Sequence, residues 1–279
     1  AQDRANIQYA CKEASRRMSS SREADWLMPK RIARYLLGAP RFEQKFVWQD
    51  EPAQADAYTD SDWAGCRSTC RSTSGGALKF GKHCLKTWSS TQATVALPSA
   101  EAELCALTTG ASQVLGLMSL LEDFGVVVSA SVRTHARAAI GIVRRAGLGK
   151  LRHLNVRYLW LQDKVREEDF ELLKVPGLAN PADLMTKHLS RVDADMHLAS
   201  LGMHLGSGRA VTALTLGKLA TKRAGGHEAT RRSNMFTTVH PSDFLSRNLW
   251  DFHPWLAISS RLDKTAWRTT WHGPSSERP

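Results

Sequence analysis

Carboxylates occur at three places in this chain where they could converge on a metal ion. Asp60 and Asp62 stand close together in YTDSDW, Glu101 and Glu103 in PSAEAELCAL, and Asp183 in NPAD. Hydrolysis of a phosphodiester with two metal ions needs several carboxylates around hard cations ~3.5–4 Å apart, so that one ion activates water and the other stabilises the leaving oxygen. The spacing alone leaves a plainer interpretation open, in which these residues are turn residues, helix caps or first-turn charges.

A histidine stands where a nuclease of this kind would carry a further carboxylate. In SVRTHARAAIGIV the chain changes at His135 from a short β-like run to a helical one. Imidazole offers a metal ion a neutral and softer nitrogen, whereas Mg²⁺ prefers anionic oxygen. His135 therefore indicates either a site in which one ligand has been replaced, or a strand end that never carried a site.

Hydrophobic periodicity predicts a sheet with helices on its faces within residues 55–189. Residues 55–92 read as three short strands with Gly- and Ser-containing turns, the pattern of an antiparallel meander. From Ser99 to Phe124 apolar residues recur at helical spacing, and strand-like and helix-like runs then alternate as far as Leu189. Residues 1–45 read as helical. Residues 190–279 are basic and weakly patterned, apart from one helix-like run, DADMHLASLGMHL, so we expect a poorly ordered tail.

The composition favours an anionic partner and carries no export signal. The chain has 279 residues and a formal charge of +11, which favours nucleic acid. No apolar run approaches the ~20 residues of a membrane span, and the polar N-terminus AQDRANIQYA has neither a signal-peptide pattern nor an initiator Met. We therefore expect a piece of a longer protein that is neither secreted nor in a membrane.

Cysteine and tryptophan usage points to no further site. The five cysteines are odd in number and lack the spacing of a disulfide framework, which predicts a reducing compartment. Cys66, Cys70, His83 and Cys84 match no common zinc-finger spacing, so ordinary thiols are favoured. Tryptophans among basic residues of the tail could stack on single-stranded nucleic acid, but a segment without an evolved fold is the favoured interpretation.

Three groups of motifs, in order, resemble the ribonuclease H domain of a copia-type retrotransposon Pol polyprotein. They are YTDSDWAG…RSTSGG, WSSTQATVALPSAEAELCAL and RHLNVRYLWLQDKV…VPGLANPADLMTKHL, within about Ala55 to Leu189. Residues 1–45 resemble the C-terminal end of the preceding reverse transcriptase, and the polymerase Tyr-x-Asp-Asp motif is absent from this chain. The resemblance implies an α/β fold: a mixed five-stranded sheet in the order β-β-β-α-β-α-β-α, helices on both faces, and a short helical segment before it.

The resemblance also implies a metal site and a substrate. Ribonuclease H enzymes hold two Mg²⁺ ions with an Asp-Glu-Asp-Asp set and cut the RNA strand of RNA–DNA hybrids. The first, second and fourth acids fall on Asp60, Glu103 and Asp183, and the third falls on His135. The resemblance thus favours a site with one replaced ligand, although a histidine without a role stays open. We expect the fold to be kept, cleavage to be severely weakened and Mn²⁺ to restore a little activity, because Mn²⁺ accepts nitrogen more readily.

Two other hypotheses remain beside an impaired nuclease. The domain is a catalytically dead nucleic-acid-binding relic in one, and an unselected translation of a degenerate element in the other. For either a nuclease or a relic, a basic cluster is expected to contact the hybrid backbone, although a solvated face is the ordinary alternative. The cluster consists of Arg144, Arg145, Lys150, Arg152 and Arg157. Other products of the polyprotein are the further partners that the resemblance implies.

Overall fold

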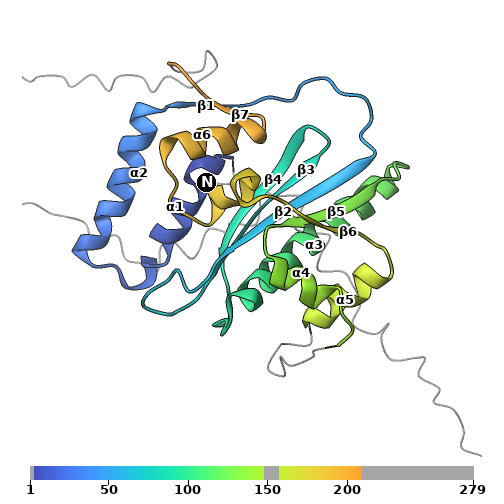
Figure 1. The fold of residues 1–279 in the computed structure, drawn as a ribbon. Helices are drawn as coiled ribbons and strands as arrows, with labels where there is room; N and C mark the ends of the chain where they lie inside the picture. Colours follow the sequence, from blue (N-terminus) through green and yellow to red (C-terminus); the bar gives the residue numbers. More distant parts are fainter. Residues whose placement is uncertain (1–2, 148–156, 209–279) are drawn as a thin grey trace, which may run out of the picture. The chain divides into compact units, whose positions relative to one another are not determined.

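A five-stranded mixed sheet forms the centre of the protein in a computed structural model that describes residues 3–147 and 157–208 (Figure 1). The strand order is β4-β3-β2-β5-β6. β2 pairs antiparallel with β3, and β3 with β4, whereas β5 lies parallel to β2 and β6 parallel to β5. The strands are β2 (Gln54–Asp62), β3 (Thr73–Phe80), β4 (His83–Thr91), β5 (Ser129–Thr134) and β6 (Glu171–Lys174). This confirms the predicted mixed sheet and its antiparallel meander.

One face of the sheet carries the larger apolar core. It is covered by α3 (Ser99–Asp123), with α4 (Arg137–Val143) and α5 (Arg157–Arg166) packed around it. Leu104 and Leu107 of α3 are buried against small residues of β2 such as Ala57. Gly110 lets helix and strand approach closely, because a Cβ there would lie 2.3 Å from a methyl carbon of Thr59.

The long helix corrects the expectation that no apolar run approaches membrane length. The 25 residues of α3 reach a mean hydropathy of 1.5 over an 18-residue window, so in the described ranges it is the one helix whose length and composition would be sufficient for a membrane span. Its buried residues, Val114 and Ala111 among them, pack against the sheet and the neighbouring helices. A core helix of a sheet domain needs the same apolar composition, which accounts for α3 here.

The other face carries a second, smaller apolar cluster. Ala77 and Cys84 of the sheet lie there with Met185, Leu198 and Leu201. These contacts come from α1 (Ala5–Ser15), the 3-10 helix η4 (Pro181–Met185) and α6 (Arg191–Ser200). Because neighbouring strand residues point to opposite faces, Ala77 joins this cluster while Leu78 joins the larger one. Helices therefore cover both faces, as predicted.

A second, small sheet joins two short strands that lie far apart in the sequence. β1 (Arg41–Gln44) pairs antiparallel with β7 (Met203–Gly206). α2 (Leu27–Gly38) packs on α1, and the short 3-10 helices η1 (Met18–Ser20), η2 (Glu23–Trp26) and η3 (Gly177–Ala179) complete the described elements.

These elements correct two sequence-based expectations at the ends of the predicted domain. Residues 1–45 are not helical throughout, since they end in β1. In the predicted tail, α6 agrees with the helix-like run DADMHLASLGMHL, whereas β7 was not predicted. Strands of four residues leave too short a pattern to recognise, and their register depends on a partner about 160 residues away in the chain. The tail from residue 209, with its tryptophans, lies outside the described residues. The boundaries at residues 55 and 189 stay predictions.

Candidate metal centre

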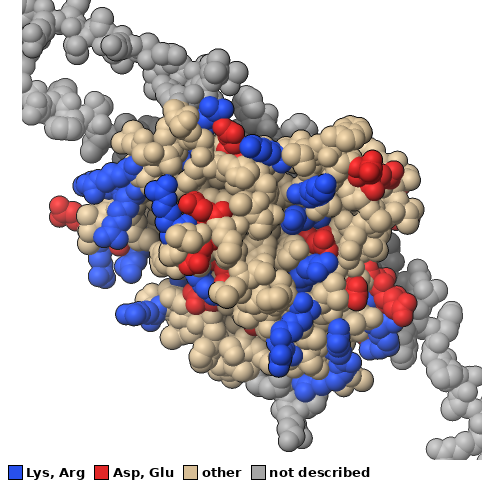
Figure 2. All heavy atoms as spheres, turned by 45° about the horizontal axis from the view of Figure 1, so that its top comes forward, with Lys and Arg blue, Asp and Glu red and all other residues tan. Residues whose placement is uncertain are grey.

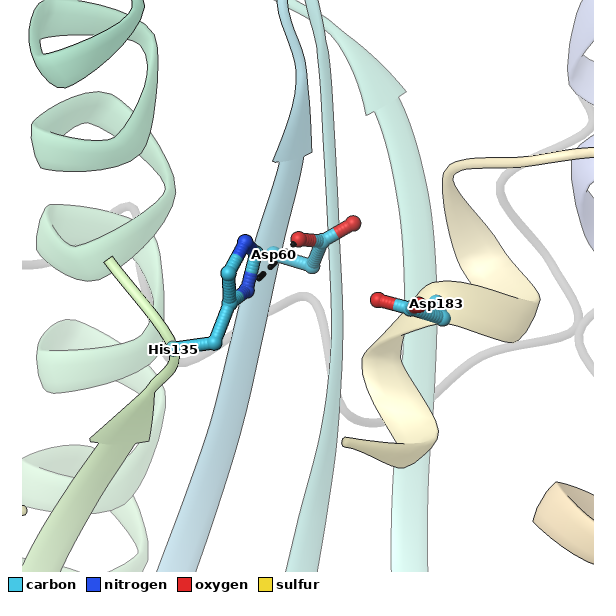
Figure 3. A group of neighbouring side chains, drawn as sticks. All are labelled: Asp60, His135 and Asp183. Carbon is cyan, nitrogen blue, oxygen red and sulfur yellow. Dashed lines mark ion pairs between the residues drawn. The ribbon is translucent and has the colours of Figure 1, made fainter. Parts of the chain in front are cut away.

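Three side chains from distant parts of the chain converge at one end of the central strands (Figure 3). Asp60 comes from β2, His135 directly follows β5, and Asp183 lies on η4. One possible ligand atom of each lies within 4.8 Å of those of the other two. Asp60 Oδ1 and His135 Nδ1 are 3.2 Å apart. The structure thus brings together three of the four positions that the sequence predicted for the site.

Parallel pairing of β2 with β5 places the first two of these side chains. Because the two strands run in the same direction, their carboxyl ends lie at the same edge of the sheet, where open α/β sheets commonly carry their sites. The hydroxyl of Thr59 donates to the Arg133 carbonyl at 3.2 Å and ties these ends together. His135 stands directly after the last residue of β5, in the step to α4. The expectation that α4 still forms despite this histidine is confirmed.

The NPAD segment is anchored to the sheet by its asparagine. Asn180 is fully buried, donates from Nδ2 to the Thr59 carbonyl at 2.9 Å, and accepts from the Ala182 amide at 3.3 Å. Pro181 opens η4, a position that needs no amide donor. Asp183 is therefore a first-turn acid that also faces Asp60. The predicted last helix is shorter than PADLMTKHL, since η4 ends at Met185.

A glycine of β3 allows η4 to lie directly on the sheet. Gly75 pairs with Asp60 in the β2–β3 register. A Cβ at Gly75 would lie 2.6 Å from Met185 Cβ and 2.6 Å from Thr186 Cγ2. The Gly-Gly step of TSGG thus makes room for the segment that carries Asp183.

The two glutamates of α3 have different surroundings. Glu101 accepts a hydrogen bond from the Leu97 amide at 2.9 Å and so closes the start of the helix. Glu103 is buried beside Ser61 and lies outside the group of Asp60, His135 and Asp183. Burial raises the pKa of Glu103 to about 8, and the charge of Asp60 adds to this increase. The predicted four-residue set is therefore split into a close group of three and a nearby buried acid.

Burial and the closeness of the carboxylates set the electrostatics of the site. Burial raises the pKa of Asp60, and the Asp183 carboxylate raises it further, against the opposing effects of Lys187, Thr186 and His135. Asp60 Oδ1, Glu103 Oε2 and Asp183 Oδ1 are buried without a hydrogen bond of regular geometry, although His135 Nδ1 lies 3.2 Å from Asp60 Oδ1 and Lys187 Nζ lies 3.0 Å from Asp183 Oδ1. Buried acceptors in proteins are normally paired, and hard divalent cations bind carboxylate oxygens. These residues therefore fit a divalent metal ion.

Two residues of the site escaped the sequence-based prediction. The Thr186 hydroxyl donates to Asp60 Oδ2, and the Lys187 ammonium lies 3.4 Å from the same oxygen and 3.0 Å from Asp183 Oδ1. Burial lowers the pKa of Lys187, but Asp60 and Asp183 raise it above its ordinary value. The i,i+4 spacing of Asp183 and Lys187 was a readable signal for their pairing, whereas the contacts with Asp60 needed the fold.

The predicted basic cluster is only partly described. Arg144 donates from Nη2 to the Leu172 carbonyl at 2.8 Å, so one of its donors serves the sheet, and Arg145 is half-buried. Lys150, Arg152 and the side chain of Arg157 lie outside the described residues. Figure 2 shows Lys and Arg at several places on one face, many of them beside Asp or Glu, with one group on the side where Figure 1 draws α2. The contact of the cluster with nucleic acid stays a prediction.

The cysteines do not form a second metal site in the described ranges. Cys84 is buried in the smaller apolar cluster, where burial raises its pKa to about 11. Cys66 and Cys70 belong to the turn after β2, and all five cysteines carry free thiols. Among residues 3–147 and 157–208, the one group that could hold a metal ion is that of Asp60, His135 and Asp183.

Several known proteins similar to this chain are Pol polyproteins of transposons. No protein-family model matches the chain. The retrovirus-related Pol polyprotein from transposon TNT 1-94 of Nicotiana tabacum is 29% identical over 203 residues, which are 72% of this chain and 15% of that polyprotein. The corresponding polyprotein from transposon RE2 of Arabidopsis thaliana is 27% identical over 192 residues, 68% of this chain and 13% of its own length. The chain is related to the Pol polyproteins of copia-type transposons.

Several solved structures similar to this chain are ribonucleases H, and another is the protease-reverse transcriptase of prototype foamy virus. LC11-RNase H1, isolated from compost by a metagenomic approach, matches 48% of this chain and 93% of its own, with a TM-score of 0.39 and 17% identity. The same protein in complex with an RNA/DNA hybrid matches 47% and 93%, with a TM-score of 0.37 and 15% identity. The fold of the Pol-related chain is ribonuclease H-like by its own sheet order and helix placement.

Proposed function

We propose that residues 55–189 are a metal-dependent ribonuclease H domain that hydrolyses the RNA strand of RNA–DNA hybrids, and that His135 impairs it. The observation that carries the proposal is the convergence of Asp60, His135 and Asp183, whose possible ligand atoms lie within 4.8 Å of one another around the buried Asp60. The Pol relatives support the same role, although the chain covers only 15% and 13% of the two polyproteins described above. Nucleic acid as partner, and the cytoplasm or nucleus as location, belong to this proposal.

Each residue of the site has a separate part in this function. Asp60, Glu103 and Asp183 would hold Mg²⁺, with Mn²⁺ as a substitute, and the bound ion supplies positive charge at the phosphate and acidifies water. Asp60 is central, because its carboxylate contacts His135, Thr186 and Lys187. Thr186 and Asn180 orient the carboxylates, Thr186 through its hydroxyl and Asn180 through its anchor on β2.

His135 weakens the site for two reasons. A neutral imidazole in place of a carboxylate removes one negative charge, which raises the energy of holding dications close together. The ring also lies 3.2 Å from Asp60 Oδ1, one of the two oxygens with which Asp60 could hold a metal ion. The nitrogen ligand suits Mn²⁺ better than Mg²⁺.

Cleavage of a labelled RNA–DNA hybrid in Mg²⁺ and in Mn²⁺ tests the proposal. The natural chain is compared with His135→Asp and with His135→Asn, a matched control that removes the imidazole without adding charge. We expect His135→Asp to cut at least about 10²-fold faster in Mg²⁺, and the asparagine variant to stay near the natural chain. Equal cleavage by all three chains contradicts the impairment, since three carboxylates would then suffice.

A catalytically dead, nucleic-acid-binding relic is the second candidate. Two nitrogen groups, those of His135 and Lys187, already lie beside the Asp60 carboxylate, and this favours binding without cleavage. Both candidates predict hybrid binding that weakens with salt, because phosphate contacts release counterions. A folded His135→Asp chain that binds but does not cut decides for the relic. Non-cooperative unfolding would point instead to a sequence without a selected fold.

A further inference from the structure

The ammonium group of Lys187 lies between the two carboxylates that a metal ion would bridge. Its Nζ is 3.4 Å from Asp60 Oδ2 and 3.0 Å from Asp183 Oδ1. Asp60 is fully buried and Asp183 is largely buried, so water solvates neither carboxylate well and a nearby positive charge stabilises both. A single ammonium thus neutralises part of the charge of both acids.

The oxygens of Asp60 are divided among the surrounding groups. Oδ1 faces His135, while Oδ2 accepts from Thr186 and faces Lys187. A cation that bridges Asp60 and Asp183 would therefore meet the ammonium at Oδ2 and at Asp183 Oδ1. Two positive charges in one buried place repel each other strongly, so both cannot stay.

Lys187 also has room to leave this position. Its side chain is 41% exposed, and it lines a groove of about 770 Å³ between α1 and α6, together with Tyr9 and His188. The flexible four-carbon stem of lysine allows such a movement at modest energy, in contrast to the fixed backbone position of Asp60. Asp195 lies in the same groove and offers a second carboxylate there.

We propose that Lys187 is a built-in counter-cation that holds Asp60 and Asp183 together in the metal-free chain, and that a divalent ion at this position must displace it. Lys187 is then a positioning residue that lowers metal affinity. The inference rests on the proposed metal-dependent function. It assigns to the site an ammonium group, that of Lys187, which the Asp-Glu-Asp-Asp pattern does not contain.

Binding of Mn²⁺, followed by its paramagnetic resonance signal without nucleic acid, tests the displacement. Lys187→Met removes the ammonium and keeps a similar stem, and Lys164→Met is the matched control, because Lys164 also lies between two carboxylates, Glu167 and Asp169. We expect Lys187→Met to bind Mn²⁺ about tenfold more tightly than the natural chain and Lys164→Met to be unchanged, a factor that corresponds to about 1.4 kcal/mol. Equal or weaker binding by Lys187→Met overturns the displacement.

Thermal unfolding in a chelator tests the counter-cation without any metal. We expect Lys187→Met to lower Tm by about 3–6 °C, because it leaves two buried carboxylates facing each other. The same substitution in an Asp183→Asn background should lower Tm by less than half as much. Equal losses in both backgrounds overturn the counter-cation role.

The two tests separate this inference from the proposed function. If His135→Asp binds Mn²⁺ but does not cut hybrid, the nuclease proposal fails while the Lys187 result stands by itself. If neither the natural chain nor Lys187→Met binds Mn²⁺, displacement is overturned, and the chelator experiment alone decides the counter-cation role.

Discussion

Two lysines of this protein each lie between two carboxylates, and their surroundings give similar charges different roles. Lys164 is 2.8 Å from Glu167 and 2.7 Å from Asp169, and all three side chains are partly exposed. Lys187 is farther from its partners, yet one of them, Asp60, is fully buried. The shorter distances thus occur where the charges are hydrated.

Burial, more than distance, decides what each group of charges can do. Water and salt screen the exposed group, so such pairs contribute little to stability. Asp60 is denied water, and burial together with the neighbouring Asp183 raises its pKa. Buried carboxylates with raised pKa values are typical of functional sites, because a cation bound beside them is stabilised far more by their charge than a cation on the surface.

The largest expected effect comes from removing the buried charge at the centre of the site. Asp60→Asn, made in the His135→Asp background, should abolish measurable Mn²⁺ binding and slow hybrid cleavage by about 10²–10³-fold or more. Asp62→Asn is the matched control, because Asp62 lies two residues farther along the same strand and interacts electrostatically with Lys12 of α1 and with Arg16, which directly follows α1. Equal losses in the two variants would place the reaction elsewhere on β2.

The buried Glu103 should make the stability of the protein depend on pH, in contrast to the exposed group of Lys164, Glu167 and Asp169. The pKa of Glu103 in the folded chain, about 8, lies above its ordinary value of 4.5. Protonated Glu103 therefore contributes to the stability of the protein fully below about pH 4.5, and this contribution is lost as the pH rises to 8. Urea unfolding in a chelator should therefore show a higher free energy of unfolding for Glu103→Gln than for the natural chain at pH 8, by on the order of 2 kcal/mol. At pH 4.5 the two chains should have nearly the same stability.

Glu101→Gln serves as the control for this pH experiment. Its carboxylate accepts from the Leu97 amide at the start of α3 instead of facing the site. A difference at pH 8 that is as large for Glu101→Gln as for Glu103→Gln would refute the assignment of the raised pKa to Glu103.

Loss of the Asn180 side chain should weaken the attachment of Asp183 on η4 to Asp60 on β2. Asn180→Ala leaves the Thr59 carbonyl without its side-chain donor and should lower the free energy of unfolding by about 2 kcal/mol. Because η4 carries Asp183, Mn²⁺ affinity in the His135→Asp background should fall about 10–100-fold as well. Isothermal titration and urea unfolding measure the two effects. Unchanged Mn²⁺ affinity beside reduced stability would show that the NPAD anchor does not position Asp183.

The smallest effect is expected at the exposed group. Lys164→Met should change Tm by less than about 1 °C at 0.15 M salt, because exposed pairs are screened. Scanning calorimetry of this variant beside Lys187→Met measures the contrast directly. A loss at Lys164 as large as that at Lys187 would mean that burial does not distinguish the two groups.

Much of the fold followed from patterns inside single segments. The alternation of residues 55–92 and the helical stripe from Ser99 predicted the meander and α3, because each segment is long enough to show its period. The pairing of β1 with β7 was missed, since four-residue strands show no period and their partners are far apart in sequence. The membrane-length composition of α3 was missed as well, because scattered Ser and Thr interrupt its apolar run.

The sequence by itself determined which residue types could form the site. Asp60, Asp183 and the histidine at position 135 became candidates because their motifs resemble those of the ribonuclease H domain, whereas spacing alone left turn, cap and first-turn interpretations open. That His135 stands in place of an acid is what the same resemblance implies.

Only the tertiary structure decided which of these groups face one another. It placed Lys187 and Thr186 against Asp60, across more than 120 residues of sequence, and left Glu103 beside Ser61 outside the close group. The energy of a charge depends on its distance from other charges and from water, and both are set when β2, β5 and η4 pack together. A residue list fixes neither quantity, so the counter-cation of the site was visible only in the fold.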